Sequence, residues 1–318
     1  MPRVAAIDCG TNSIRLLVAD VSASADGSLS LRDVHREMRI VRLGQGVDAS
    51  GMLAPGALER TRAALVDYTA VLRRKGTERV RMVATSATRD AGNRDDFFGM
   101  VRDTLGVDAE VISGDEEANL SFVGAVGDLD PEDGPFAVVD VGGGSTELVV
   151  GTLDEGGKAT VQAARSVDVG SVRITERCLA GDPPTTDEVA TGRDVTSGIL
   201  ADAFAAVPVA GVRTWVGVAG TVTTLSAVAQ HLPEYDPAAV HLSRLTLDDL
   251  HRVAADLLDM SREERRTHRA IHEGRIDVIG GGALIVDELA RELHTGAGIT
   301  ELVVSEHDIL DGIARSIA

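Results

Sequence analysis

Aromatic residues and cysteines are scarce in this sequence of 318 residues, and it has no long apolar run. Phe, Trp and Tyr together make up 3% of the chain, so its cores must be built mainly from aliphatic side chains. Cys9 and Cys178 are too few and too far apart for a disulfide scaffold, which indicates a reducing compartment. The absence of about 20 consecutive apolar residues argues against a membrane span. Met1-Pro2-Arg3 leads directly into a strand-like segment and leaves no room for a signal peptide, so we expect a cytoplasmic protein.

Positive charge is also in short supply. The chain has 31 Lys and Arg against 50 Asp and Glu, a net charge of -19. Such a surface repels nucleic acid and anionic membranes, and we expect neither as a partner. It would repel a polyanionic substrate as well. Any phosphate site must therefore be compensated locally by cations, backbone amides and a few arginines.

The hydrophobic pattern predicts an α/β protein, and 318 residues are enough for two domains. Short apolar segments bounded by turn residues predict strands, and apolar residues at helical spacing predict helices. The predicted strands are residues 4–8, 14–20, 80–84, 109–112, 136–140, 147–151 and 301–305. The predicted helices are residues 57–74, 94–105, 116–126, 223–230, 248–259, 277–293 and 308–317. An acidic segment with two prolines, residues 129–135, is the candidate boundary between the domains.

One local pattern occurs twice. Ile7-Asp8-Cys9-Gly10-Thr11-Asn12-Ser13 aligns without gaps to Val139-Asp140-Val141-Gly142-Gly143-Gly144-Ser145. Asp, the first Gly and Ser coincide, and each segment runs from one apolar strand through a turn into another. Glycine turns can present backbone amides and hydroxyls to a phosphate, although such residues are also common in ordinary hairpin turns. Two matched copies favour the phosphate interpretation, with one phosphate held between two similar halves.

Carboxylates accompany both turns. Asp8 and Asp140 each end an apolar strand, where an unpaired charge would be costly, and Glu147 begins the strand after the second turn. Oxygen ligands of this kind suit a hard cation, so Asp140, Glu147 and Asp8 are candidate ligands for Mg²⁺, with Mn²⁺ as a possible substitute. The same aspartates can also stabilise their turns by side-chain hydrogen bonds, and we expect both roles to operate together.

A further acid lies at a predicted helix start. Ser113 and Glu116 have the spacing of a capping box, which leaves Glu117 in the first helical turn. A carboxylate there could activate water, or it could simply be a solvated acid that the helix dipole favours. Spacing alone favours the second interpretation.

Three other segments are candidates for ligand contacts. Residues 85–89 form a predicted polar loop after a strand, where Arg89 could bind phosphate. Residues 217–221 contain Gly220 and Thr221 and could present helix amides to a further phosphate. The glycines at 280–282 lie at the start of a predicted apolar helix. They could allow close packing against a neighbouring element, form a phosphate-binding turn, or do both.

The sequence resembles the exopolyphosphatase/guanosine-pentaphosphatase (Ppx/GppA) family of the actin-like, ribonuclease-H-like ATPase superfamily. The matching segments occur in family order and cover nearly the whole chain. They are Ile7-Asp8-Cys9-Gly10-Thr11-Asn12-Ser13, Ala84-Thr85-Ser86-Ala87-Thr88-Arg89, Ile112-Ser113-Gly114-Asp115-Glu116-Glu117-Ala118, Val139-Asp140-Val141-Gly142-Gly143-Gly144-Ser145-Thr146-Glu147-Leu148 and Gly220-Thr221.

The resemblance implies two ribonuclease-H-like domains with an active-site cleft between them. We expect residues 1–127 and 128–305 to form these domains, with a C-terminal helix at 306–318 that packs back on the first. The resemblance makes Glu117 the catalytic base, places Asp140 and Glu147 near the metal, and implies a homodimer. It assigns phosphate binding to the two turns, to Arg89 and to the later glycine segment. The phosphate-binding residues are Gly10, Thr11, Asn12, Ser13, Arg89, Gly142, Gly143, Gly144, Ser145, Gly220 and Thr221.

Two departures from the family pattern affect the expected substrate. Asn119 stands where many relatives have arginine, which removes one phosphate contact. The sequence ends at Ala318 without the C-terminal helical domains of longer relatives, so we expect action on short polyphosphate chains.

The sequence thus predicts an exopolyphosphatase and leaves several alternatives open. One is a phosphohydrolase acting on guanosine pentaphosphate or nucleoside triphosphates. Another is a phosphotransferase, which predicts a nucleotide pocket near 217–221 and 280–282. The last is a non-catalytic regulator that binds an alarmone. Retention of Glu117 beside complete phosphate turns argues against the regulator, because a binding module needs no base.

Overall fold

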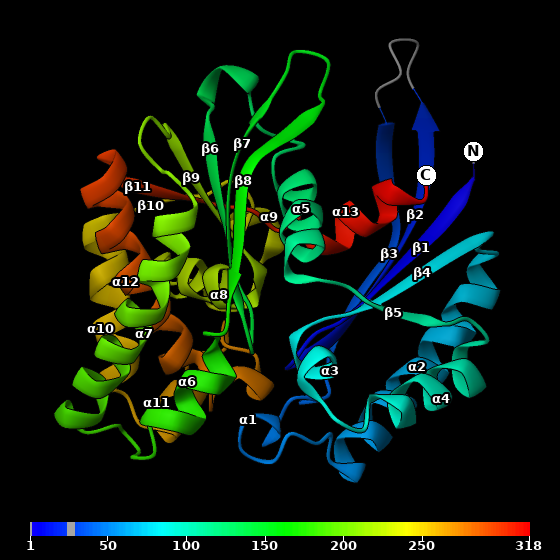
Figure 1. Cartoon of the computed structure of the whole chain (residues 1–318), viewed down its shortest axis with the longest axis horizontal. Coiled ribbons are helices and arrows are strands. Elements are labelled where there is room, and N and C mark those ends of the chain that lie inside the picture. The colour runs from blue at the N-terminus through cyan, green and yellow to red at the C-terminus, as the bar shows by residue number, and fades with distance from the viewer. Residues whose placement is uncertain (1, 24–28) are drawn as a thin grey trace.

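The computed structural model describes residues 2–23 and 29–318 and consists of two lobes, each built on one β-sheet (Figure 1). The first sheet has the strand order β3-β2-β1-β4-β5. Its strands are β1 (Arg3–Cys9), β2 (Ser13–Ala23), β3 (Leu29–Ile40), β4 (Arg79–Ala84) and β5 (Ala109–Val111). The first three strands pair antiparallel, and β4 and β5 continue parallel to β1.

The second sheet repeats this plan, with the order β10-β11-β9-β6-β7-β8. Its strands are β6 (Phe136–Val141), β7 (Thr146–Leu153), β8 (Ala159–Val167), β9 (Thr214–Val218), β10 (Arg244–Thr246) and β11 (Glu301–Val304). Apart from the short edge strand β10, the order and the strand directions match those of the first sheet. The predicted fold class, two ribonuclease-H-like α/β units, is confirmed.

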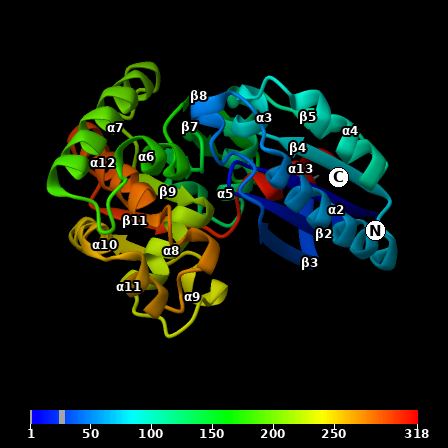
Figure 2. The same cartoon turned by 90° about the horizontal axis from the view of Figure 1, so that it is seen from below.

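Helices cover both faces of each sheet, and Figure 2 shows the two lobes side by side from below. The helices of the first part of the chain are α1 (Val47–Ser50), α2 (Pro55–Lys75), α3 (Ser86–Asp90), α4 (Arg94–Leu105) and α5 (Gly114–Ala125). Those of the second part are α6 (Ser171–Cys178), α7 (Thr186–Ala206), α8 (Ala219–Ala229), α9 (Pro237–Val240), α10 (Leu247–Asp259), α11 (Arg262–Thr267), α12 (Ile279–Ala297) and α13 (Ile309–Ser316). Short 3-10 turns lie at Pro131–Asp133 and Glu273–Arg275. Among the described residues, no helix is both long and apolar enough to cross a bilayer.

Two helices occupy the space between the sheets. Leu120 of α5 packs with α13 against the inner face of the first sheet, while Ala118 and Phe122 of α5 pack against the second sheet. The helix α5 therefore contributes to both cores, and α13 brings the end of the chain back onto the first sheet. The division of the chain at residues 127 and 128 stays a prediction; that point lies in the link between α5 and β6.

Most predicted elements are present, and the differences have local causes. Residues 85–89 were predicted as a polar loop, which is wrong: Ser86–Asp90 is the short helix α3. Five residues are too few to show helical periodicity in a sequence. The edge strand β3 was not predicted because charged residues interrupt its apolar pattern. Two of these, Arg32 and Arg36, form ion pairs with Asp20 and Asp311.

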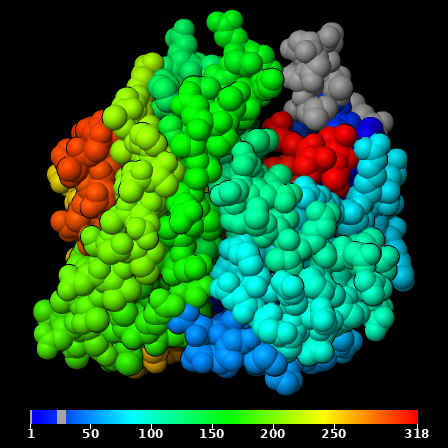
Figure 3. Space-filling model, in the orientation of Figure 1, coloured from blue at the N-terminus to red at the C-terminus, as the bar shows by residue number. Residues whose placement is uncertain are grey.

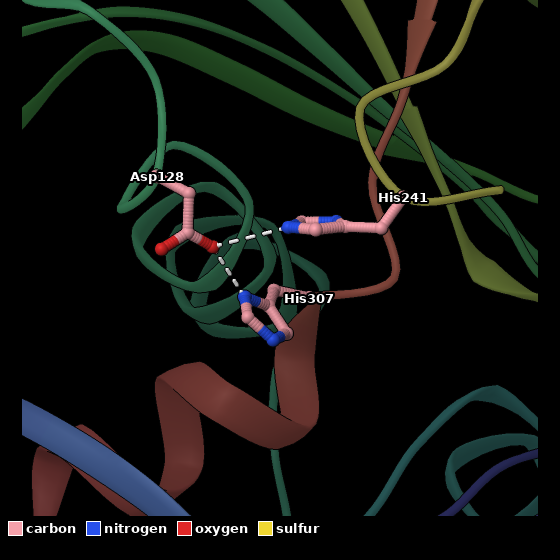
Figure 4. Close-up of side chains that lie close together, drawn as sticks. All are labelled: Asp128, His241 and His307. Atoms are coloured by element: carbon pink, nitrogen blue, oxygen red, sulfur yellow. Dashed lines mark hydrogen bonds and ion pairs between the residues drawn. The ribbon is translucent and has the colours of Figure 1, made fainter. Parts of the chain in front are cut away.

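The chain crosses between the lobes twice, and a carboxylate and two imidazoles join these crossings (Figure 4). Asp128 lies just after α5, and His307 lies between β11 and α13. Asp128 Oδ2 is 2.5 Å from His307 Nδ1 and 3.5 Å from His241 Nε2. His241 Nδ1 accepts a hydrogen bond from the Glu306 amide at 3.2 Å, which leaves the neutral ring's proton on Nε2, facing Asp128. The trio is therefore satisfied as a hydrogen-bonded cluster, and a metal at Nε2 would have to displace that proton.

The Asp128–His307 pair makes stability depend on pH. The hydrogen bond to Asp128 raises the pKa of His307 above 6.5, with a further contribution from Asp311, against burial and Arg36. Bonds from both histidines lower the pKa of Asp128 below 3.8. Because the pKa of His307 is raised, its contribution to stability is complete below pH 6.5 and is lost as the pH rises through the pKa of the folded state. Because the pKa of Asp128 is lowered, its contribution is complete above pH 3.8 and is lost as the pH falls through the pKa of the folded state. The pair therefore contributes most between these limits.

A His307→Gln substitution tests this linkage. Because both groups are partly exposed, we expect it to lower the free energy of unfolding by only about 1 kcal/mol at pH 6, and by much less at pH 9. Urea unfolding at the two pH values measures the difference. His268→Gln, whose ring forms no ion pair within the described ranges, is the control and should show no such trend. An equal loss at both pH values would contradict the ion pair.

Candidate active site between two glycine turns

The two predicted turns have the same backbone geometry and touch each other. The Gly10 amide donates to Ser13 O at 3.0 Å, and the Gly142 amide donates to Ser145 O at 3.0 Å. A Cβ placed on Gly143 would lie 3.0 Å from the Cβ of Thr11. Glycine is therefore needed at position 143 for the close approach, and the duplicated segments face each other across the two lobes.

The outward carbonyls of both turns are occupied. The amides of Ser171 and Val172, at the start of α6, donate to Gly142 O and Gly143 O, each at 2.9 Å. In the first turn, Thr11 O accepts from the Gly44 amide and Asn12 O from the Arg42 amide, both at 2.8 Å. Within the described part of the chain, the amides that donate to no protein acceptor include those of Thr11, Asn12, Gly143 and Gly144. Free amides with bonded carbonyls are the arrangement that an anion-binding nest requires.

A cavity of about 90 Å³ lies between the turns, large enough for several water molecules. Most of the predicted site residues line it. These are Asp8, Gly10, Thr11, Asn12, Ser13, Glu117, Asp140, Gly142, Gly143, Gly220 and Thr221. Four others are not on its wall: Arg89, Gly144, Ser145 and Glu147. The fold thus gathers predicted residues from four separate segments around one small space.

Glu117 is positioned by the first turn of α5. The Ser113 hydroxyl caps this helix by accepting from the Glu116 amide at 3.2 Å. The predicted capping box is only half formed, because the Glu116 carboxylate binds Arg81 at 2.6 Å instead of returning to Ser113. Glu117 is 7% exposed, so the interpretation as a solvated helix-start acid is wrong.

Burial and an arginine determine the charge state of Glu117. Arg89 Nη1 donates to Glu117 Oε2 at 3.1 Å and to Ile112 O at 3.0 Å, so Arg89 contacts the acid from outside the cavity. Burial raises the pKa of Glu117 to about 8; Arg89 opposes this, and Asp140 and Asp8 reinforce it. A carboxyl with a raised pKa and one fixed partner is suited to accept a proton near neutral pH.

The other carboxylates are also buried close to one another. Asp140 accepts from Ser121 Oγ at 2.5 Å, and Glu147 accepts from Ser166 Oγ at 2.7 Å. Burial is the main reason that the pKa of Asp140 is raised to about 6, and burial also raises the pKa values of Glu147 and Asp8. Repulsion from neighbouring carboxylates adds to each shift, from Asp308 for Asp8 and Asp140 and from Glu117 and Asp140 for Glu147. A cluster of this kind would be stabilised by a cation.

One oxygen atom at the cavity has no partner. Arg15 Nη2 binds Asp8 Oδ2 at 2.6 Å, but the buried Asp8 Oδ1 makes no hydrogen bond within the described residues. Asp8 Oδ1 and the carboxylate of Asp140 therefore fit a hard cation at the cavity wall. Asp8, Asp140 and Glu147 do not form a cluster with ligand atoms within 4.8 Å of one another; the trio that does, among the described residues, is Asp128, His241 and His307.

The strand register extends the duplication to a further pair of positions. Asp8 lies opposite Arg15 in the β1–β2 pair, and Asp140 lies opposite Glu147 in the β6–β7 pair. The first hairpin thus pairs an acid with a base where the second pairs two acids. Arg15 also binds Asp308, at the start of α13. Sequence reasoning missed Arg15, although a single charge in an apolar strand, seven residues after Asp8, was a usable signal.

A second arginine was missed as well. Arg275 lines the cavity, and its guanidinium occupies the space beside Gly220, where a Cβ would lie 2.0 Å from Nη2. Arg275 Nη1 donates a long hydrogen bond to Thr224 Oγ1, at 3.5 Å. No carboxylate of the described residues forms an ion pair with Arg275. An unpaired guanidinium at the wall of an acidic cavity is suited to an anion. No local pattern marks this residue in the sequence.

The glycines at 280–282 are a close-packing point. A Cβ on Gly281 would lie 2.5 Å from Thr175 Oγ1, and one on Gly282 would lie 2.5 Å from the Thr221 side chain. Neither these two glycines nor Gly280 lines the cavity. They allow α12 to pack against α6 and α8, which places the start of α8 at the cavity.

A larger cavity of about 460 Å³ adjoins the first. The two share Arg15, Ala219, Gly220 and Arg275. The larger cavity has an apolar wall that includes Met38, Tyr235, Pro237 and Leu310, and basic groups at Arg36, Arg269 and His272. It touches the segment 217–221 but not 280–282, so it matches only half of the nucleotide pocket that a phosphotransferase predicts.

Known proteins resemble the chain along its whole length. A sequence model of the Ppx/GppA phosphatase family matches residues 20–317. Exopolyphosphatase 2 of Mycobacterium tuberculosis is 58% identical over 324 residues, covering 100% of this chain and 99% of that protein. A crystal structure of an exopolyphosphatase-like protein aligns with a TM-score of 0.91 and 43% identity, covering 100% of this chain and 99% of the other. The PPX-GPPA enzyme of Aquifex aeolicus aligns with a TM-score of 0.78 and 33% identity, covering 99% of each chain.

Proposed function

The chain belongs to the Ppx/GppA phosphatase family, and on that premise we propose that it is an exopolyphosphatase, which hydrolyses the terminal phosphate of inorganic polyphosphate. The observation that carries this proposal is the cavity between two touching glycine turns, with free amides on the wall and the buried Glu117 beside them. The relative with 58% identity, named exopolyphosphatase 2, supports the same substrate.

Substrate binding follows from the donors around the cavity. The terminal phosphate lies between the two turns and accepts hydrogen bonds from amides in both, including those of Gly143 and Asn12. The hydroxyls of Ser13 and Thr221 add donors, and Arg275 supplies positive charge. These local donors offset the repulsion that a net charge of -19 would exert on a polyanionic substrate.

A divalent cation completes the proposed site. Mg²⁺, or Mn²⁺ in its place, would be held by Asp8 and Asp140, with Glu147 next to Asp140 in the strand register. Bound there, the cation neutralises charge on the phosphate oxygens. Without it, Asp8, Asp140 and Glu117 would repel the substrate.

Glu117 acts as the general base. Its carboxylate accepts a proton from a water molecule as the water oxygen bonds to the terminal phosphorus and the bridging P–O bond breaks. Orthophosphate and a chain shorter by one unit are the products. Arg89 holds the carboxylate in place at 3.1 Å, so we assign it to the orientation of Glu117 in preference to phosphate binding. Positioning and charge stabilisation account for most of the rate in such reactions.

Guanosine pentaphosphate is the second candidate substrate, and the larger adjoining cavity favours it. Apolar walls beside Tyr235 and Met38 could accept a guanosine group while the phosphates extend to Arg275 and the turns. Nucleoside triphosphates would use the same contacts. A regulator that binds an alarmone without hydrolysis is less consistent with the buried, arginine-held Glu117. The homodimer and the cytoplasmic location stay predictions.

Phosphate release from four substrates separates these functions. Short polyphosphate, long polyphosphate, guanosine pentaphosphate and ATP are each incubated with the protein, with and without Mg²⁺. We expect release from polyphosphate, faster from short chains, and almost none without the cation. Preference for guanosine pentaphosphate would favour the second candidate. Failure to release phosphate from any of the four, with either Mg²⁺ or Mn²⁺, would reject the enzyme.

A further inference from the structure

The guanidinium of Arg173, in α6, connects the second glycine turn to the first lobe. Its Nε donates to Gly144 O at 2.9 Å. Nη1 binds Asp48 Oδ1 at 2.6 Å, and Nη2 binds Asp90 Oδ2 at 2.7 Å and Ser86 Oγ at 3.4 Å. Figure 3 shows the blue segment that contains α1 against the green second lobe at the bottom of the molecule. One side chain thus binds the turn on one lobe and two carboxylates on the other.

We propose that Arg173 is a positioning residue, which holds the two glycine turns in register around a substrate phosphate. This inference rests on the proposed function in one respect, that the turns bind the phosphate. Arg173 does not line the cavity and acts through the turn that it holds.

The contacts explain why the position requires arginine. With its side chain 12% exposed, the guanidinium is shielded from water, and three of its nitrogens bind four partners in different directions. A lysine ammonium is a single point charge and cannot reach Gly144, Asp48 and Asp90 together. Bonding of Gly144 O also completes the set of occupied carbonyls in the second turn, which keeps its amides available for an anion.

The first-lobe partners carry this effect to the rest of the site. Asp90 ends α3, whose preceding residue Thr85 lines the cavity. A Cβ on Gly144 would lie 2.4 Å from Ser86 Oγ, so the turn and the start of α3 are in direct contact where Arg173 binds both. Loss of the guanidinium would free the turn from α3 at this point.

Arg177 provides a matched control. It lies one turn later in α6 and binds the same Asp48, with Nε 2.5 Å from Oδ2 and Nη2 2.6 Å from Oδ1. Within the described part of the chain, Arg177 forms no hydrogen bond to the glycine turn. A comparison of the two arginines therefore distinguishes the effect of losing an ion pair between the lobes from the effect of losing the bond to the turn.

The experiment compares Arg173→Met, Arg173→Lys and Arg177→Met for kcat and KM on short polyphosphate, and for the free energy of unfolding. We expect Arg173→Met to lower kcat on the order of 100-fold, because the reacting groups lose their alignment. Arg173→Lys should remain close to Arg173→Met. Arg177→Met should change kcat by less than about fivefold, as expected for a partly exposed ion pair. An Arg173→Met variant within about fivefold of wild type, or equal losses in both methionine variants, would overturn the proposal.

A second measurement does not depend on turnover. Inorganic phosphate, titrated into each protein by calorimetry, should bind at least tenfold more weakly to Arg173→Met than to Arg177→Met, because alignment of the turns is lost. If the wild type binds phosphate and hydrolyses nothing, the proposed function fails, and this comparison still tests Arg173. Equal phosphate affinities in the two variants would overturn the positioning role. If the wild type neither binds nor releases phosphate, both proposals fail.

Discussion

A Glu117→Gln variant is expected to keep its fold and to lose phosphate release by about 1,000-fold in kcat, within the usual range for removal of a general base. Glutamine has the shape of glutamate, and its amide oxygen can still accept the hydrogen bond from Arg89, recorded at 3.1 Å. It cannot accept a proton from water at neutral pH. Burial and the neighbouring Asp140 and Asp8 already disfavour the charged form of Glu117, so its replacement by a neutral side chain should not lower the free energy of unfolding.

The control for this variant is the neighbouring acid. Glu116→Gln removes a carboxylate from the same helical turn, but its partner is Arg81 and it does not face the cavity. Phosphate release is measured for both variants and the wild type with saturating Mg²⁺. A Glu117→Gln enzyme with more than about a tenth of wild-type kcat would remove Glu117 from the role of base. Since the base acts when deprotonated and burial raises its pKa to about 8, the wild-type rate should increase as pH rises through neutrality.

The second large effect concerns the contact between α5 and α13. A Cβ added at Gly124 would lie 1.8 Å from Asp308 O, and one added at Gly312 would lie 2.1 Å from Leu120 O. Both obstacles are backbone atoms, which cannot rotate away. We therefore expect Gly124→Ala to lower the free energy of unfolding by about 3 kcal/mol, the upper end for overpacking, with similar loss for Gly312→Ala.

The same substitution in an open helix is the control. Gly99 lies inside α4 (Arg94–Leu105), and no atom comes within 4 Å of a Cβ added there. Gly99→Ala should raise stability by about 0.5–1 kcal/mol, because alanine loses less backbone entropy on forming a helix. Urea unfolding of the three variants measures the contrast. If Gly124→Ala is as stable as the wild type, the two helices do not pack as closely as the structure has them.

The contact between α5 and α13 also bears on catalysis. Glu117 lies in the first turn of α5, and Asp308, which binds Arg15 beside Asp8, caps the start of α13. A shift of the two helices would therefore move groups on both sides of the cavity. For this reason Gly124→Ala should lose activity even at temperatures where it remains folded.

Much of the site was predictable because its pattern is local. The Asp, Gly and Ser of each turn lie within six residues, and short-range backbone geometry fixes how such a turn bends and where its amides point. The duplication then implied that the turns belong to equivalent units, and the two sheets have that matching order. The regular spacing of apolar residues likewise marked the strands and helices that carry Asp8, Asp140 and Glu117.

Other features depend on which distant segments meet, and residue spacing does not record that. Arg275 reaches the cavity because α8 has a glycine at position 220, and Arg173 is placed by Asp48 and Asp90 on the other lobe. By spacing, Glu117 is an ordinary acid at a helix start; burial under the second sheet and contact with Arg89 make it a candidate base. The sequence by itself determined the two turns and the α/β class, since both follow from short-range geometry and periodicity, while the ribonuclease-H-like arrangement was implied by the resemblance to the family. Only the tertiary structure decided the partners of the charged groups, because burial and ion pairing arise when segments that are distant in the sequence pack together.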